Sequence, residues 1–88
     1  MAFLAMLQVS VADRALSAIQ AVTRTAEVHH DLDLELFELG LLDSLGVVEL
    51  MVLLADDLGL QLSPAEFDRD EWATPRKIVA FVESRLGP

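Results

Sequence analysis

The sequence predicts an all-α protein, built as a bundle of three to four helices. In three separate stretches, apolar residues recur every three to four positions, which is the period of a helix with one buried face. Each stretch opens with a capping residue or a proline, and two of them run into a glycine, as helices commonly do. One further stretch alternates like a strand, but the chain offers no second one to pair with it. At 88 residues, the chain is expected to form a single domain.

The first helix is expected to begin after Ser10 and to end near residues 25–26. Ser10 can accept a hydrogen bond from a free amide of the first turn, and Asp13 lies beside the positive end of the helix dipole. Residues 1–9 are apolar but lack the basic residues with which a signal peptide begins, so they are interpreted as a tail or a helix extension. The buried stripe of this helix is expected to consist of Val11, Ala15, Leu16, Ile19 and Val22.

Residues 28–42 are predicted to form a long loop. Leu32, Leu34 and Leu36 alternate with acidic residues, and because no partner strand exists, a loop held to the core by its leucines is favoured over a strand. Loops of this length without regular structure are usually functional, which draws attention to the serine that follows this one.

The second helix is predicted to run from Ser44 to about Leu58 and to stop at Gly59. At about 100° per residue, its side chains divide into two faces. The face expected to enter the core consists of Val47, Leu50, Met51, Leu54 and Leu58. The opposite, semi-apolar face consists of Leu45, Val48, Glu49, Val52 and Asp56. A lone surface helix does not need these apolar residues, whereas a helix that docks on partners does.

The C-terminal third is predicted to hold a short helical turn and a final helix. Ser63 is a capping residue followed by a proline, with Glu66 at the third helical position, so a turn is expected to start there. Phe67 and Trp72 are expected to fill the core between this turn and the last helix, which starts at Thr74. The residues of that helix expected to face inward are Ile78, Val79, Phe81, Val82 and Leu86.

Charge and composition exclude several classes of protein. The formal charge of −9 repels nucleic acid phosphates and acidic membranes, so basic protein partners are favoured. No apolar run approaches the roughly 18 to 20 residues of a membrane span, so an integral membrane protein is not expected. The chain has no cysteine, which excludes disulfides and thiolate metal sites and fits a cytoplasmic location.

Two chemical alternatives fail on spacing. The acids after His29-His30 have the first spacings of a calcium loop, but leucine occupies both the sixth position (Leu36) and the twelfth (Leu42), where glycine and glutamate are needed. No metal site is therefore predicted. A hydrolase would need Ser44 in a strand-to-helix elbow with a base, and neither a G-x-S-x-G motif nor a strand is present.

Ser44 itself has two interpretations at this point. A phosphate ester on its hydroxyl would lie at the N-terminus of the second helix, where unpaired amides and the positive dipole end stabilise an anion. Alternatively, Ser44, or Asp43 before it, is only the N-cap of that helix. Spacing alone leaves both interpretations open.

The residues around Ser44 resemble those of a known superfamily. Asp43-Ser44-Leu45 ahead of Val48-Glu49-Leu50, with Leu39-Gly40 just upstream, resembles the acyl and peptidyl carrier proteins. The Glu-Phe-x-Arg-Asp-x-Trp-x-Thr stretch at residues 66–74 is more specific and is similar to that of stand-alone D-alanyl carrier proteins of teichoic acid D-alanylation.

This resemblance implies a single, non-catalytic carrier domain with the acyl-carrier-protein-like fold. Ser44 would receive 4'-phosphopantetheine from coenzyme A, and Asp43 would help to engage the phosphopantetheinyl transferase and its metal. An adenylating ligase would load an aminoacyl or acyl group as a thioester, and a downstream acyltransferase would remove it. The face of Leu45, Val48, Glu49, Val52 and Asp56 would bind these partners, and a carrier that visits several partners in turn is expected to be a monomer.

The cargo is less well defined than the carrier role. Residues before about position 40 match the D-alanyl carriers only loosely, so a discrete carrier of natural-product biosynthesis is an equivalent interpretation. The alternative from a different class is an acidic helical protein-interaction module with no prosthetic group, in which Ser44 is only a cap.

Overall fold

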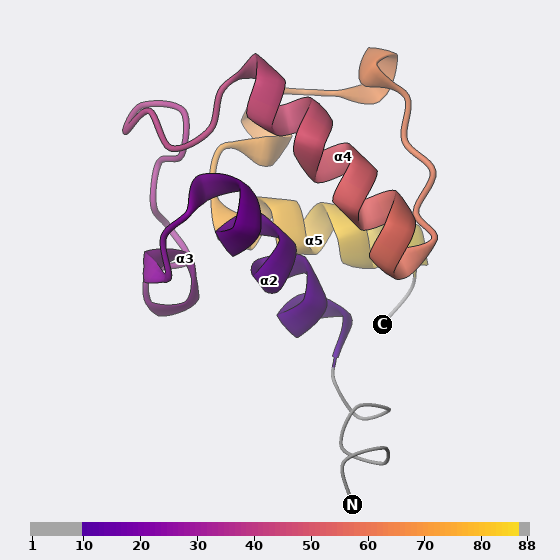
Figure 1. Ribbon diagram of the computed structural model, residues 1–88, viewed down its shortest axis with the longest axis horizontal. Helices are drawn as coiled ribbons and strands as arrows, with labels where there is room; N and C mark the ends of the chain where they lie inside the picture. Colours follow the sequence, from indigo (N-terminus) through magenta and orange to yellow (C-terminus); the bar gives the residue numbers. More distant parts are fainter. Residues whose placement is uncertain (1–9, 87–88) are drawn as a thin grey trace, which may run out of the picture.

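The computed structural model describes residues 10–86, which form a helical bundle without any strand (Figure 1). The expectation for residues 1–9, and a helix stop at residues 87–88, fall outside this described part. The helices are α2 (Val11–Thr23), α3 (Glu27–His30), α4 (Ser44–Leu58) and α5 (Pro75–Leu86), with two short 3-10 turns, η1 (Pro64–Glu66) and η2 (Asp70–Trp72). The predicted all-α fold is confirmed.

Helix α2 lies at the centre of the packing because it contacts both α4 and α5 (Figure 1). Ser10 caps it as predicted, its hydroxyl oxygen accepting a hydrogen bond of 3.0 Å from the Asp13 amide. The helix ends at Thr23, slightly before the expected position, because Arg24 adopts the left-handed conformation (φ 62°) that ends many helices. The short α3 follows directly, in a region expected to be irregular, and its Val28 is fully buried.

The core lies between the long helices and includes several aromatic rings. A row of rings runs from Phe37 through Phe67 and Trp72 to Phe81, with neighbouring centroids 5.6 to 6.0 Å apart. Such tilted and edge-on pairs add to the free energy gained by burying the rings. The predicted role of Trp72 is confirmed, since it is 1% exposed, while Phe67 is half-buried.

The two faces of α4 are placed as the helical period predicts. Val47, Leu50, Met51 and Leu54 are buried, and Leu58 is half-buried at the end of the helix. All five residues of the predicted outer face are exposed. The prediction for α5 is wrong at one position: Leu86 is 39% exposed, because as the last residue of the helix it lies at the rim of the bundle, whereas Ile78 and Val82 on the same stripe are fully buried.

The loop between α3 and α4 is held to the core by two of its leucines. Leu36 is fully buried and Leu42 nearly so, and the Leu36 carbonyl accepts hydrogen bonds from the amides of Leu41 and Leu42. The Leu36 amide in turn donates to the Ala73 carbonyl at 2.9 Å. Leu39 does not follow the prediction, because it lies at the outward-facing turn of the loop and is 58% exposed. The loop thus reaches α4 along a path fixed by a few buried contacts.

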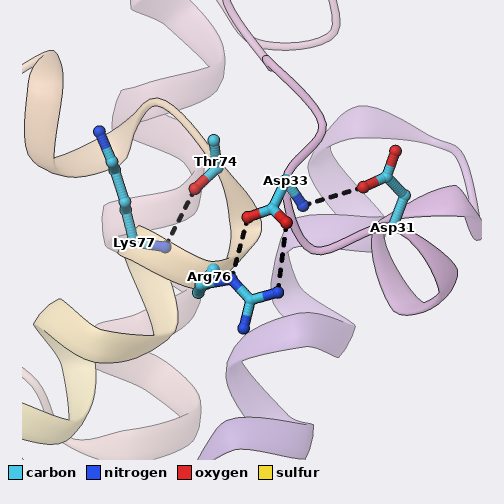
Figure 2. A network of polar contacts seen from close by, with 5 residues as sticks. All are labelled: Asp31, Asp33, Thr74, Arg76 and Lys77. Atoms are coloured by element: carbon cyan, nitrogen blue, oxygen red, sulfur yellow. Dashed lines mark hydrogen bonds and ion pairs between the residues drawn. The ribbon is translucent and has the colours of Figure 1, made fainter.

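An ion pair also ties this loop to the start of α5 (Figure 2). The Arg76 guanidinium donates to both carboxylate oxygens of Asp33, at 2.9 and 3.3 Å, and the Arg76 amide donates to the Leu32 carbonyl at 2.9 Å. Asp31 accepts a hydrogen bond of 3.0 Å from the Asp33 amide. These acids therefore organise the loop, and residues 10–86 contain no group of three or more His, Cys, Asp or Glu side chains arranged to hold a metal ion.

The Asp33–Arg76 pair should make stability fall in acid. The hydrogen bond from Arg76, aided by its charge, holds the pKa of the Asp33 carboxyl below its ordinary value despite slight desolvation. A lowered folded-state pKa means that the contribution is fully present above the unfolded-state pKa, about 3.9, and is lost as the pH falls through the folded-state pKa. Asp33→Asn should therefore lower stability near neutral pH, with a difference from wild type that vanishes once the pH has fallen below the lowered folded-state pKa of Asp33.

Urea unfolding of both proteins across this pH range measures the difference. It should be small, since the pair is exposed to solvent. Glu35→Gln, an exposed acid of the same loop, is the control and should show no such pH dependence. A difference between Asp33→Asn and wild type that grows in acid would contradict the assignment.

Candidate functional site

Ser44 is the first residue of α4, and its neighbour Asp43 performs the capping. The Asp43 carboxylate accepts a hydrogen bond of 2.8 Å from the Gly46 amide, and the Asp43 backbone is extended, as at other N-caps. Ser44 is exposed, and none of the hydrogen bonds formed among residues 10–86 uses its hydroxyl. Asp43, and not Ser44, is therefore the capping residue, and the Ser44 hydroxyl has no hydrogen-bond partner among the described residues.

Gly46 lets the start of α4 lie close to its surroundings. A methyl group added at this position would come within 3.0 Å of the Leu42 side chain and 3.2 Å of the Val22 side chain. Because these distances are shorter than ordinary van der Waals contacts, a larger residue would require the side chains of Leu42 and Val22 to shift. Glycine therefore permits the close packing of the start of α4 against α2 and the loop.

Two hollows in the surface meet at Ser44. The smaller one, of about 200 Å³, lies between α4 and η1 and is mostly apolar. Its lining residues are Ser44, Val47, Val48, Met51, Pro64 and Phe67. The larger one, of about 400 Å³, lies between α4 and the long loop. Its lining residues are Phe37, Gly40, Leu42, Asp43, Ser44, Val47, Phe67 and Arg69. Ser44 thus borders space that a substituent on its side chain could occupy.

The exposed face of α4 begins next to Ser44. Leu45, Val48 and Val52 are 67%, 47% and 54% exposed, which is unusual for apolar side chains arranged along one helix face. Glu49 and Asp56 lie on the same face and are also exposed. The structure therefore brings the five predicted partner residues together on one surface, with Ser44 at its N-terminal end.

Comparison with known proteins identifies the family. A model of the phosphopantetheine attachment site family matches residues 13–82. The chain belongs to this family. It is similar to the D-alanyl carrier proteins of Enterococcus faecalis (40% identical over 75 residues, covering 85% of this chain and 96% of the relative) and of Lacticaseibacillus rhamnosus (47% over 68 residues, 77% and 84%). A D-alanyl carrier protein of Staphylococcus saprophyticus is 42% identical over 71 residues, covering 81% of this chain and 91% of the relative.

The family assigns a general role to this carrier. It is a carrier protein with covalently attached 4'-phosphopantetheine, and it is not itself an enzyme, since the chemistry of carriers is performed by their partners. A phosphopantetheinyl transferase and a ligase are the general partners that such a role requires. The alternative of an interaction module without a prosthetic group does not agree with this family.

Some features of the carrier could not be found from sequence patterns. Arg69, which lies well after α4 in the chain, shares a hollow with Ser44, and no periodic pattern points to this proximity. Leu39 was expected to face the core together with the other leucines of the loop, but it is exposed, and residue type alone does not distinguish it from the buried Leu36. Finally, none of the described helices is long and apolar enough to cross a membrane.

Proposed function

We propose that this carrier holds 4'-phosphopantetheine on Ser44 and uses it to pass an aminoacyl or acyl group from an adenylating ligase to a downstream acyltransferase. The observation that carries the proposal is that Ser44 is exposed and its hydroxyl makes no hydrogen bond within residues 10–86, while Asp43 performs the capping. When bound, the group supplies a thiol on which the cargo is held as a thioester.

The surroundings of Ser44 fit a phosphodiester. The first amides of α4 have no acceptor within the helix, and the positive end of the helix dipole lies at the same place, so both favour an anion there. The two hollows that meet at Ser44 leave room for the start of a flexible arm. Asp43 stays exposed beside the serine, which agrees with the proposed contact of its carboxylate with the phosphopantetheinyl transferase and its metal.

The outer face of α4 is the proposed docking surface for these partners. Burying Leu45, Val48 and Val52 against a partner would remove exposed apolar area from water, which is favourable in proportion to that area. Glu49 and Asp56 at its edges would pair with basic partner residues and help to orient them. The carrier would act as a monomer, because it must present this one surface to each partner in turn. Its proposed location is the cytoplasm.

The relatives suggest the cargo. They are named D-alanyl carrier proteins, so D-alanine is the first candidate for the group carried here. A discrete carrier of natural-product biosynthesis would have the same site, because the ligase selects the cargo. Loading with a panel of amino acids and the cognate adenylating ligase separates the two: D-alanine as the preferred substrate supports the D-alanyl assignment, and preference for another acid contradicts it.

Attachment at Ser44 is tested by mass spectrometry. Incubation of the unmodified chain with coenzyme A and a broad-specificity phosphopantetheinyl transferase should add the mass of one phosphopantetheine, and Ser44→Ala should abolish the gain completely. Ser10→Ala is the matched control, since Ser10 is also an exposed serine at the start of a helix, and it should retain the full gain. No gain in the wild type, or a gain that survives Ser44→Ala, would overturn the proposal.

A further inference from the structure

Of residues 10–86, Arg69 is the only positively charged one that lines either hollow at Ser44. It lies in the larger hollow, whose other charged lining residue is the Asp43 carboxylate. The smaller hollow has no charged lining residue. In a chain with a formal charge of −9, a phosphodiester on Ser44 would add a further anion beside Asp43. Arg69 is therefore the side chain placed to offset this local negative charge.

The guanidinium of Arg69 is held in place more by an aromatic ring than by an ion pair. Its central carbon lies 4.6 Å from the centroid of the Phe37 ring, a cation–π contact. Phe37 in turn packs on Phe67, the next ring in the aromatic row. The pair between Arg69 and Glu38 is long, at 3.6 Å, and their side chains are 62% and 74% exposed, so it is a weak interaction. The guanidinium can therefore exchange its carboxylate for a better anion without leaving the ring.

We infer that Arg69 is a positioning residue for the prosthetic arm: it binds the phosphodiester on Ser44, in place of Glu38, and so restricts the base of the arm. Phosphate oxygens match the planar donor fork of a guanidinium and form stronger hydrogen bonds with it than neutral acceptors do. The inference rests on attachment at Ser44, as proposed above. It goes further by assigning two partners to Arg69: Glu38 in the carrier without the arm, and the phosphodiester in the carrier with the arm.

The chain contains a matched control for this inference. Arg85 also lies over a ring, 4.9 Å from the centroid of Phe81, and also pairs with one acid, Glu66, at 3.3 Å. Arg85 lines neither hollow at Ser44. The two arginines thus have the same kind of surroundings and differ in whether they share a hollow with the attachment serine.

The experiment compares the phosphorus NMR spectra of wild type, Arg69→Gln and Arg85→Gln, each with the arm attached. Mass spectrometry first shows that each protein has been converted completely. Arg69→Gln should change the chemical shift of the phosphodiester signal, whereas Arg85→Gln should leave it as in the wild type. Raising the ionic strength from about 0.1 M to about 1 M shortens the screening length from about 10 Å to about 3 Å. The wild-type signal should therefore move toward that of Arg69→Gln, whose own signal should stay constant.

A second measurement uses the side-chain N–H signals of the arginines in wild-type protein, so that it does not depend on a variant folding. Attachment of the arm should shift the Arg69 signal and leave that of Arg85 in place. Glu38→Gln removes the competing carboxylate and should shift the Arg69 signal of the arm-free protein while leaving the phosphorus signal of the loaded carrier unchanged.

The outcomes separate this inference from the proposed attachment. Full conversion of the wild type with equal phosphorus signals in wild type, Arg69→Gln and Arg85→Gln, and with no arm-dependent shift of the Arg69 signal, would overturn the role of Arg69 and leave Ser44 as the attachment residue. Absence of any mass gain in the wild type would overturn the attachment itself and, with it, the inference.

Discussion

Replacing Trp72 by alanine is expected to lower the free energy of unfolding by about 3 to 5 kcal/mol. The side chain is 1% exposed, and its ring lies 5.7 Å from that of Phe67 and 5.6 Å from that of Phe81, centroid to centroid. Alanine would leave a cavity between η2 and α5 that the surrounding rings can only partly fill. Since Trp72 is the only tryptophan, urea unfolding should be followed by far-UV circular dichroism and not by fluorescence.

Trp72→Phe is the control that separates packing from hydrogen bonding. The Trp72 indole nitrogen is buried and has no hydrogen-bond partner among the described residues, so phenylalanine removes no such bond. It also retains an aromatic ring beside Phe67 and Phe81, and the loss of stability should be clearly smaller than for alanine. Equal losses in the two variants would mean that the aromatic row contributes nothing beyond the indole itself.

Leu54→Ala should cost about 2 to 5 kcal/mol of unfolding free energy, because Leu54 is fully buried on the inner face of α4. Val48→Asp, on the opposite face of the same helix, should leave stability nearly unchanged, because Val48 is 47% exposed. The second substitution should instead weaken transfer of cargo between partners, since it places a charge in the proposed docking surface.

Urea unfolding and a loading assay with the cognate ligase, applied to both variants, test this pair of expectations. Val48→Asp should unfold at the wild-type urea concentration and load more slowly. Leu54→Ala should unfold at a lower concentration but load normally under conditions in which it is folded. A large loss of stability in Val48→Asp would contradict the division of α4 into two faces, and normal loading of Val48→Asp would contradict the docking surface.

Helix α4 therefore combines two functions along its length. Its inner face supplies Leu50 and Leu54 to the core, which fixes the direction of the helix. Its outer face leaves Leu45 and Val48 exposed beside the proposed attachment serine. Since a rigid helix presents both, a partner that docks on the outer face would find Ser44 at a fixed distance and orientation.

The helical parts were predictable because they depend on neighbours in sequence. The inner and outer faces of α4 follow from the period of a long helix, and Ser10 and Ser63 cap their helices through atoms only two or three residues away. The same locality explains two failures. Helix α3 has four residues, too few for a period to be recognised, and Leu86 follows the period of α5 but lies at its end, where the core stops.

The sequence was sufficient to predict the all-α fold, because the spacing of apolar residues carries that information. The carrier role followed from the resemblance of residues 43–50 and 66–74 to known carrier proteins. The sequence left open whether Ser44 is a cap, because serine and aspartate are equally good caps and their backbone angles depend on how the loop is held. In the structure, the buried Leu36 and Leu42 hold the loop to the core just before α4, the Asp43 backbone is extended and its carboxylate caps the helix, and Ser44 makes no hydrogen bond with its hydroxyl among residues 10–86. The same packing brings Arg69 to the hollow at Ser44, a proximity of residues distant in sequence that no local pattern encodes.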